Sequence, residues 1–374
     1  NKVSFCNPCI IIMYVLYNLI IRRSRNTTMT KLFLIRHAEA EGNLYRFAQG
    51  QMESFITPTG YKQIALLAER FRDEQIDVLY SSDLRRTLTT AGAITKYHGL
   101  TPIRDPGLRE MGLGIFEGVA FGNMRKADPQ QMYYFNCDPD KWCVEGAETF
   151  RECTERIFTA VSRIAEENDG KTVAVVSHGM VIRSLLAHIL GVKSENISDV
   201  PHGDNTAVSL LTYEDGQFTV HYMNDVSHLP PELSPFRKQV WWRKGYNGAE
   251  PGNLSFEPLD PTAPVPEIFG AYLGDALGAA AEDFALSPEC VAGVYCGTEP
   301  AGVIAFRPEQ DLCRIDALCL ADEYRGQGLG IQLLGYIVLY ARKHDINLLR
   351  LGFEPADERG AAFARDKGFV PGTD

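Results

Sequence analysis

The sequence has no excess of positive charge, no apolar run long enough to cross a membrane, and no second cysteine pair beside its one C-x-x-C spacing. Its 374 residues carry a formal net charge of -11, which argues against nucleic acid or an anionic membrane surface as a partner. The apolar stretch over 10–21 is shorter than the ~20 residues that a membrane span needs. Cys6 and Cys9 lack a neighbouring pair, so a zinc or redox role there is not expected.

Other missing features concern location and the start of the fold. The nine cysteines are an odd number scattered along the chain, which is typical of reduced thiols and predicts a cytoplasmic location. The first stretch lacks the cleavage site of a secretory signal, and we expect residues 1–28 to lie outside the native fold. Met29 stands directly before the first predicted strand and is the expected start of the native protein.

What is present is a globular composition, with 45% hydrophobic residues and a length that predicts two or three domains. The apolar run 32–35 has the length of a buried strand and ends in Arg36 and His37. A neutral imidazole can attack phosphorus, and a guanidinium beside it can bind phosphate oxygens through two N–H groups. The pair alone is weak evidence, because dipeptides recur by chance.

Two further apolar runs, 78–80 and 172–176, also lead into polar residues. These are Ser82 and Arg86 after the first run, and Ser177 and His178 after the second. A glycine-rich loop between the two runs carries Glu110, a carboxylate that could act as a general acid. Because the carboxyl ends of parallel strands meet at one edge of a sheet, we expect these side chains to converge on a single crevice.

Strand-like runs alternate with helical segments through the first 228 residues. This alternation predicts a three-layer α/β/α domain with a mostly parallel sheet. The alternating runs 207–212 and 218–223, joined by a Gly-containing turn, predict a hairpin at the edge of that sheet.

In this order, the motifs resemble those of the histidine phosphatase superfamily, which includes the cofactor-dependent phosphoglycerate mutases. They are Arg36-His37-Ala38-Glu39 with Asn43, Ser82-Asp83-Leu84 with Arg86, Leu108-Arg109-Glu110, and Ser177-His178-Gly179. The resemblance spans about 31–228 and implies that His37 is the nucleophile and that Glu110 protonates the leaving oxygen. It also implies that no metal or cofactor is needed and that four side chains bind the phosphoryl group, namely Arg36, Asn43, Arg86 and His178.

Within the superfamily, the loop 114–118 resembles that of the phosphatase branch, including alpha-ribazole phosphatases. Mutases usually carry a longer insertion than the segment 119–143 found here. We therefore expect hydrolysis of a small phosphorylated metabolite, and a mutase-type isomerase stays the alternative. Glu53 stands near the position where many relatives have Asp, which leaves the substrate open.

Residues 229–251 are rich in proline and glycine and predict a linker between a domain at 29–228 and a second domain at 252–374. In the second domain, a strand over 314–320 leads through a glycine-rich turn into an apolar helix over 331–342. Exposed backbone N–H groups in such a turn, together with the start of the helix, form a site for a pyrophosphate.

This second stretch resembles the GNAT acetyltransferases, which have a mixed α/β fold. The resemblance implies that the backbone at Leu318 and Leu320 pairs with the pantetheine arm of acetyl-CoA and that an amine is the acceptor. It assigns the pyrophosphate to the turn residues Arg325, Gly326, Gln327, Gly328, Leu329 and Gly330. Ala364 stands where many relatives have a Tyr acid, and the last strand of the family fold is expected to be absent. A domain that binds acetyl-CoA without transferring it, and regulates the phosphatase, is therefore an alternative.

Overall fold

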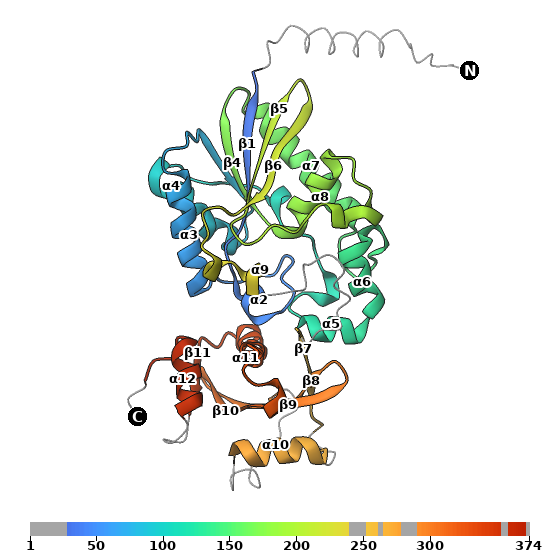
Figure 1. Cartoon of the computed structure of the whole chain (residues 1–374), viewed down its shortest axis with the longest axis vertical. Helices are drawn as coiled ribbons and strands as arrows, with labels where there is room; N and C mark the ends of the chain where they lie inside the picture. Colours follow the sequence, from blue (N-terminus) through green and yellow to red (C-terminus); the bar gives the residue numbers. More distant parts are fainter. Residues whose placement is uncertain (1–27, 239–251, 261–264, 278–289, 353–357, 372–374) are drawn as a thin grey trace, which may run out of the picture.

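The computed structural model describes five stretches of the chain, namely residues 28–238, 252–260, 265–277, 290–352 and 358–371. They contain two β-sheets, one of six strands in the upper part of Figure 1 and one of five strands in the lower part. The predicted N-terminal extension, as far as residue 27, and most of the predicted linker, 239–251, lie outside the described residues. No helix in the described stretches combines the length and the apolar character that crossing a membrane requires.

The six-stranded sheet has the order β3-β2-β4-β1-β5-β6. Its strands are β1 Thr30–Arg36, β2 Val78–Ser81, β3 Ile103–Arg104, β4 Thr172–Ser177, β5 Val208–Glu214 and β6 Gln217–Asp225. The first four are parallel, and β5 and β6 form an antiparallel hairpin next to β1. The mostly parallel sheet and the edge hairpin confirm the fold predicted for this domain.

Helices cover both faces of this sheet. The helices α3 Pro58–Phe71 and α4 Arg85–His98 lie on one face, and α7 Phe150–Glu167 and α8 Gly179–Ile189 lie on the other. The domain also contains α2 Glu41–Tyr45, α5 Phe121–Ala127, α6 Pro129–Cys137 and α9 Pro235–Lys238. Leu32 and Leu34 of β1 share a core with α7 and α8, whereas Phe33 and Ile35 share a core with α3 and α4. The run is apolar at every position because both faces of the strand are buried.

The five-stranded sheet has the order β11-β10-β9-β8-β7. Its elements are β7 Leu254–Pro258, α10 Glu267–Leu277, β8 Val291–Cys296, β9 Glu299–Glu309, β10 Leu312–Leu320, α11 Gly330–Lys343, β11 Leu348–Leu351 and α12 Glu358–Asp366. Phe269 of α10 packs on one face of the sheet, and Leu333 and Ile337 of α11 pack on the other. This is the mixed α/β domain that the sequence predicts.

The two domains pack against each other through α2 and α11 (Figure 1). Tyr45 of α2 lies against Gly335 of α11, where a Cβ atom would stand only 2.5 Å from the Tyr45 Cβ. Tyr45 and Ala120 belong to the first domain, yet both pack on the core of the second. The close approach of the two helices therefore depends on a glycine at position 335.

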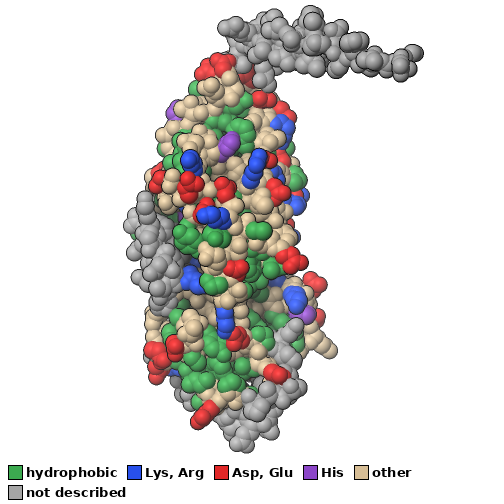
Figure 2. Space-filling model, turned by 90° about the vertical axis from the view of Figure 1, so that its right-hand side faces the viewer, with side chains coloured by type: hydrophobic (Ala, Val, Ile, Leu, Met, Phe, Trp, Pro, Cys, Tyr) green, Lys and Arg blue, Asp and Glu red, His purple; other side chains and the backbone are tan. Residues whose placement is uncertain are grey.

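A second contact joins α5 to β7. The Asn123 side chain donates to the Phe256 carbonyl at 2.7 Å and accepts the Phe256 N–H at 2.9 Å. Lys126 forms an ion pair with Glu257 in the same contact. The second domain thus lies on the end of the first domain where α2 follows β1. On the face drawn in Figure 2, acidic and basic side chains are interspersed over both domains.

Candidate active site

His37 follows the last residue of β1 and is buried beside the end of β4. Its backbone N–H donates to the Ser177 carbonyl at 2.9 Å, and its Nδ1 lies 2.7 Å from the Ala38 carbonyl oxygen. A carbonyl oxygen can only accept, so Nδ1 carries the proton of the neutral ring and Nε2 presents a lone pair. Nε2 is therefore the atom that can attack phosphorus.

The pKa of His37 lies well below its ordinary value of 6.5. Burial is the largest cause, and the positive charges of Arg86 and Arg36 add to it. Both effects disfavour the imidazolium form. The ring consequently stays neutral, and thus nucleophilic, at neutral pH.

Arg86, in the first turn of α4, is fully buried and connects three parts of the site. Its guanidinium donates to the backbone carbonyls of Gln49 at 3.3 Å, Gly50 at 2.6 Å and Met52 at 2.9 Å. Its Nε donates to His178 Nδ1 at 3.2 Å, so in neutral His178 the proton is on Nε2, which donates to Ser82 Oγ at 2.9 Å. The rings of His178 and His37 are 5.3 Å apart between centroids. The three predicted strand ends thus meet at one point.

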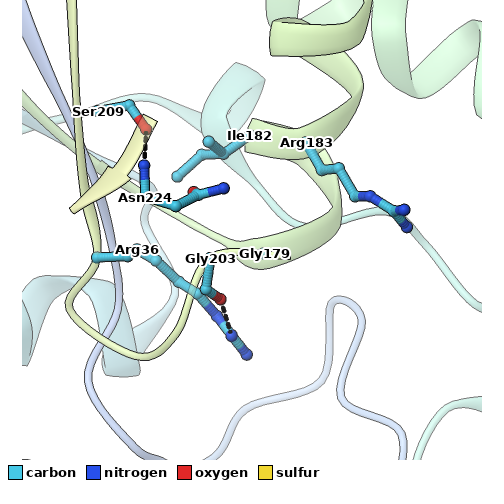
Figure 3. Close-up of a pocket in the computed structure, with 8 residues that line it drawn as sticks. Arg36, Gly179, Ile182, Arg183, Gly203, Ser209 and Asn224 are labelled. Atoms are coloured by element: carbon cyan, nitrogen blue, oxygen red, sulfur yellow. Dashed lines mark hydrogen bonds between the residues drawn. The ribbon is translucent and has the colours of Figure 1, made fainter. Parts of the chain in front are cut away.

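Arg36 extends over Gly179 with its guanidinium pointing away from Ser209 and Asn224 (Figure 3). Nη1 donates to the Gly203 carbonyl at 2.6 Å, but the buried Nε has no hydrogen-bond partner among the described residues. An unpaired buried donor is costly, and a cationic one is suited to an anionic oxygen. The cavity beside Arg36 measures about 10 Å³, which accommodates one water molecule and no phosphoryl group.

Gly179 is the first residue of α8, and Arg36 leaves no room there for a side chain. A Cβ atom would stand 3.1 Å from Arg36 Nε and 3.3 Å from its Cζ. We expect Gly179→Ala to displace the guanidinium and to lower kcat/KM for an aryl phosphate by about 10- to 100-fold. Gly92→Ala on α4 is the matched control, since nothing lies within 4 Å of its added Cβ. Equal activity of the two variants would contradict the role given to Arg36.

Glu110 lies beside the start of α8. Its carboxylate oxygens accept the backbone N–H groups of Met111 at 2.9 Å, Met180 at 3.1 Å and Val181 at 3.0 Å. A helix N-terminus favours a negative charge, which holds the carboxylate in place. Its charge acts on both Arg36 and Arg86, so the structure places Glu110 with the predicted phosphate-binding residues.

Asn43 reaches the site through a residue that the sequence interpretation missed. Asn205 Nδ2 donates to Asn43 Oδ1 at 3.2 Å and to the His37 carbonyl at 3.0 Å. Asn205 lies in a loop before β5 rather than at the end of a parallel strand. The rule that the carboxyl ends of parallel strands converge therefore does not predict it. The available signal was the polar run 204–206 directly before an apolar strand.

The pH dependence of stability follows from four histidines, of which His37 and His178 are buried and His202 and His228 are half-buried. Each has a lowered pKa with burial as the largest cause; they are His37, His178, His202 and His228, the last with a pKa of about 4. In the unfolded chain each titrates near 6.5. Below that pH the unfolded state binds protons that the folded state does not, so stability is complete above pH 6.5 and is lost as the pH falls.

We expect the free energy of unfolding to fall below pH 6.5 by about 1.4 kcal/mol per pH unit for each of these histidines. Urea unfolding followed between about pH 7.5 and about pH 5.5 measures the slope. His228→Gln removes one of the four titrating rings and should therefore reduce the slope by about 1.4 kcal/mol per pH unit. A midpoint that does not change over this range would contradict the neutral state of these rings.

The predicted pyrophosphate site is the turn between β10 and α11. Gly326 and Gly328 have φ angles of 75° and 76°, in the left-handed region that glycine adopts readily, and α11 begins at Gly330. Successive N–H groups in such a turn, followed by a helix start, bind anions. Among the residues that the structure describes, none lies within 4 Å of where a Cβ would stand on Gly326 or Gly328, which leaves room for a ligand at the turn.

The other predicted residues of the turn shape it. Arg325 Nε donates to the Leu320 carbonyl at 2.6 Å, and its Nη1 pairs with Asp322 at 2.6 Å. Gln327 Nε2 donates to the Glu323 carbonyl at 2.6 Å, and Leu329 is buried in the core. The backbone N–H groups after Arg325 are therefore the main donors for an anion.

Among the described residues, the part of β10 next to this turn has a strand partner on one side only. β11 pairs with β10 only as far as Ile315, and a register shift follows between Ile315 and Ala317. Within the described residues, Leu318 and Leu320 have a strand partner only in β9. An extended pantetheine arm can add to such an edge, so turn and strand together fit acetyl-CoA. Bound there, it would supply a thioester that an amine can attack.

A neutral histidine, two arginines and a carboxylate at the carboxyl edge of a mostly parallel sheet define an α/β enzyme of phosphoryl chemistry. No group of three or more His, Cys, Asp or Glu side chains in the described stretches is placed to hold a metal ion. Residues 32–226 match the histidine phosphatase superfamily (branch 1), and residues 257–369 match the acetyltransferase (GNAT) family. The chain belongs to the histidine phosphatase superfamily and carries a GNAT acetyltransferase domain, which confirms both predicted resemblances.

Individual relatives match the first domain. Phosphoglycerate mutase-like protein 4 of Arabidopsis thaliana is 33% identical over 212 residues, covering 55% of this chain and 90% of that protein. Phosphoserine phosphatase 1 of Hydrogenobacter thermophilus is 29% identical over 201 residues, covering 54% of this chain and 95% of that protein. Among solved structures, YhfR of Bacillus stearothermophilus has a TM-score of 0.52 at 30% identity and covers 53% of this chain and 98% of its own.

Proposed function

We propose that the first domain hydrolyses a small phosphomonoester, without a metal, through a phosphohistidine at His37. The observation that carries this is the neutral His37 ring, with its Nε2 lone pair free of a proton, close to the positive charges of Arg36 and Arg86. Phosphoryl oxygens carry negative charge, and preorganised cations stabilise that charge in the transition state.

The reaction has two steps. His37 Nε2 forms a bond to phosphorus as the ester P–O bond breaks, and Glu110, which enters the cycle as the protonated acid, donates that proton to the leaving oxygen and becomes the carboxylate. Water then attacks the phosphohistidine, Glu110 takes a proton from that water, and the N–P bond breaks to release phosphate and neutral His37. Arg36, Arg86, His178 and Asn43 bind the phosphoryl oxygens.

Hydrolysis is favoured over isomerisation because a phosphoserine phosphatase is among the relatives and the segment 119–143 is short, holding α5, α6 and a single 3-10 turn over Pro139–Lys141. Phosphoserine and 3-phosphoglycerate are the first substrates to test, in the presence of EDTA. Release of inorganic phosphate supports the proposal. Conversion of phosphoglycerate that exceeds hydrolysis and depends on a bisphosphorylated primer would support a mutase instead.

For the second domain we infer acetyl-CoA binding at the turn after β10 and acetyl transfer to an amine. One observation favours a second candidate, binding without transfer: Ala364 is buried on α12 and offers no hydroxyl to protonate the CoA thiolate. Calorimetry with acetyl-CoA tests binding, and release of free CoA in the presence of a panel of amines tests transfer. Binding without amine-dependent CoA release would select the second candidate.

A further inference from the structure

Arg342, in the last turn of α11, reaches out of the GNAT domain to the histidine phosphatase domain. Its Nη2 lies 2.8 Å from Glu41 Oε1 of α2, and its guanidinium lies 4.4 Å from the centre of the Phe55 ring. The other oxygen of Glu41 accepts the Phe55 N–H at 3.1 Å. The Glu41 side chain is only 11% exposed, so this charge pair is poorly screened by solvent on one side.

These contacts lie next to the phosphatase site. Helix α2 starts four residues after His37, and its Asn43 bonds to Asn205, which in turn holds the His37 carbonyl. Phe55 lies in the loop whose earlier carbonyls, at positions 49, 50 and 52, accept the Arg86 guanidinium. The position of α2 and of this loop therefore sets the placement of Asn43 and Arg86.

The opposite end of α11 is the acetyl-CoA turn. Gly330 begins the helix directly after that turn, and Gly335, one turn further on, packs against Tyr45 of α2. A helix of 14 residues is a rigid element, so Gly330, Gly335 and Arg342 move together. A ligand that fixes the start of α11 also fixes the two contacts that α11 makes with α2.

We propose that Arg342 is a positioning residue of the phosphatase site, and that through it the binding of acetyl-CoA and of the phosphate ester is linked. The inference rests on the proposed function of both domains. Because linkage is reciprocal, an occupied phosphoryl site must change acetyl-CoA affinity by the same factor by which acetyl-CoA changes ester affinity. Both ligands bind groups that the α2–α11 contact holds in place, so each tightens the binding of the other.

The test is calorimetric titration of the full chain with acetyl-CoA, with and without orthovanadate as a mimic of the transferring phosphoryl group. We expect vanadate to lower the acetyl-CoA Kd by about fivefold or more in the wild type. Arg342→Gln should abolish this difference, and so should Glu41→Gln, which keeps a hydrogen-bond acceptor for Phe55. Arg342→Lys should retain part of it, because an ammonium group can still pair with Glu41.

Lys343→Gln is the matched control, since it removes the same charge from the same turn of α11 and leaves the Arg342–Glu41 pair intact. It should keep the full difference. Arg342→Gln should also raise KM for an aryl phosphate more than it lowers kcat, with an unfolding midpoint equal to that of Lys343→Gln. A variant that is merely destabilised would instead show a lower kcat together with a lower unfolding midpoint.

The outcomes separate this inference from the function on which it rests. A wild type that hydrolyses aryl phosphate and binds acetyl-CoA, but with the same Kd in vanadate, overturns the linkage alone. A difference that survives in Arg342→Gln overturns the role of Arg342. Absence of acetyl-CoA binding overturns the function proposed for the GNAT domain, and the linkage with it.

Discussion

His37→Ala is expected to lower kcat/KM for an aryl phosphate by a factor of about 10⁴ or more. The substitution removes Nε2, the atom proposed to bond to phosphorus, and the other groups of the site cannot replace it. Arg36 and Arg86 are cations, His178 has its Nδ1 occupied by Arg86, and the Glu110 carboxylate accepts three backbone N–H groups. Steady-state kinetics with purified variants measures the loss.

The control for this variant is His221→Ala. His221 lies on β6 and bonds to Thr212 of the neighbouring strand, away from the other site residues. The His221→Ala variant should retain wild-type kinetics. The His37→Ala variant should keep the wild-type unfolding midpoint above pH 6.5. Activity of His37→Ala within tenfold of the wild type would refute His37 as the nucleophile.

The second large effect is expected at Arg86. Arg86→Gln should lower kcat/KM by about 10³-fold, because it removes a buried cation that faces the developing phosphoryl charge. It also leaves three carbonyls and His178 Nδ1 without their donor. Burial lowers the pKa of Arg86 to about 10, so the side chain still carries its charge at neutral pH.

Two companion variants separate charge from geometry. Arg86→Lys keeps a cation but cannot reach four acceptors at once, and we expect it to recover only part of the loss. Arg85→Gln removes the adjacent arginine, which is exposed and lies over the Phe55 ring, and should cost no more than about threefold. A larger loss in Arg85→Gln than in Arg86→Gln would show that the wrong arginine was assigned.

The sequence predicted those site residues that follow apolar runs. Arg36 is the last residue of β1, and Ser82 and His178 directly follow β2 and β4. The rule that parallel strand ends converge predicts that these three residues lie together. In the structure, β1 and β4 are paired so that Arg36 stands opposite Ser177, and the two strand ends therefore lie at the same edge of the sheet. Asn205 was missed because it lies in a loop whose position depends on tertiary contacts, and β3 was missed because two residues give no periodic pattern.

Contacts between the two domains also could not be predicted from the sequence. Tyr45 and Arg342 are separated by nearly the whole chain, and neither carries a motif, so their roles depend on how two separate folds meet. The glycines at 326 and 328 predicted a turn after β10, and the structure has a turn there with both glycines in the left-handed region. Its Arg325, however, bonds to Leu320 and Asp322 in the structure, a detail that depends on local geometry rather than on spacing.

The most direct test of the central claim is a rapid-quench reaction followed by mass spectrometry of the peptides under conditions that preserve acid-labile phosphate. We expect one phosphoryl group on the peptide that carries His37, formed within the first turnover and lost once the substrate is exhausted. We also expect the adduct to be absent from His37→Ala. An adduct on another residue, or full turnover without any phosphorylated enzyme, would contradict the claim.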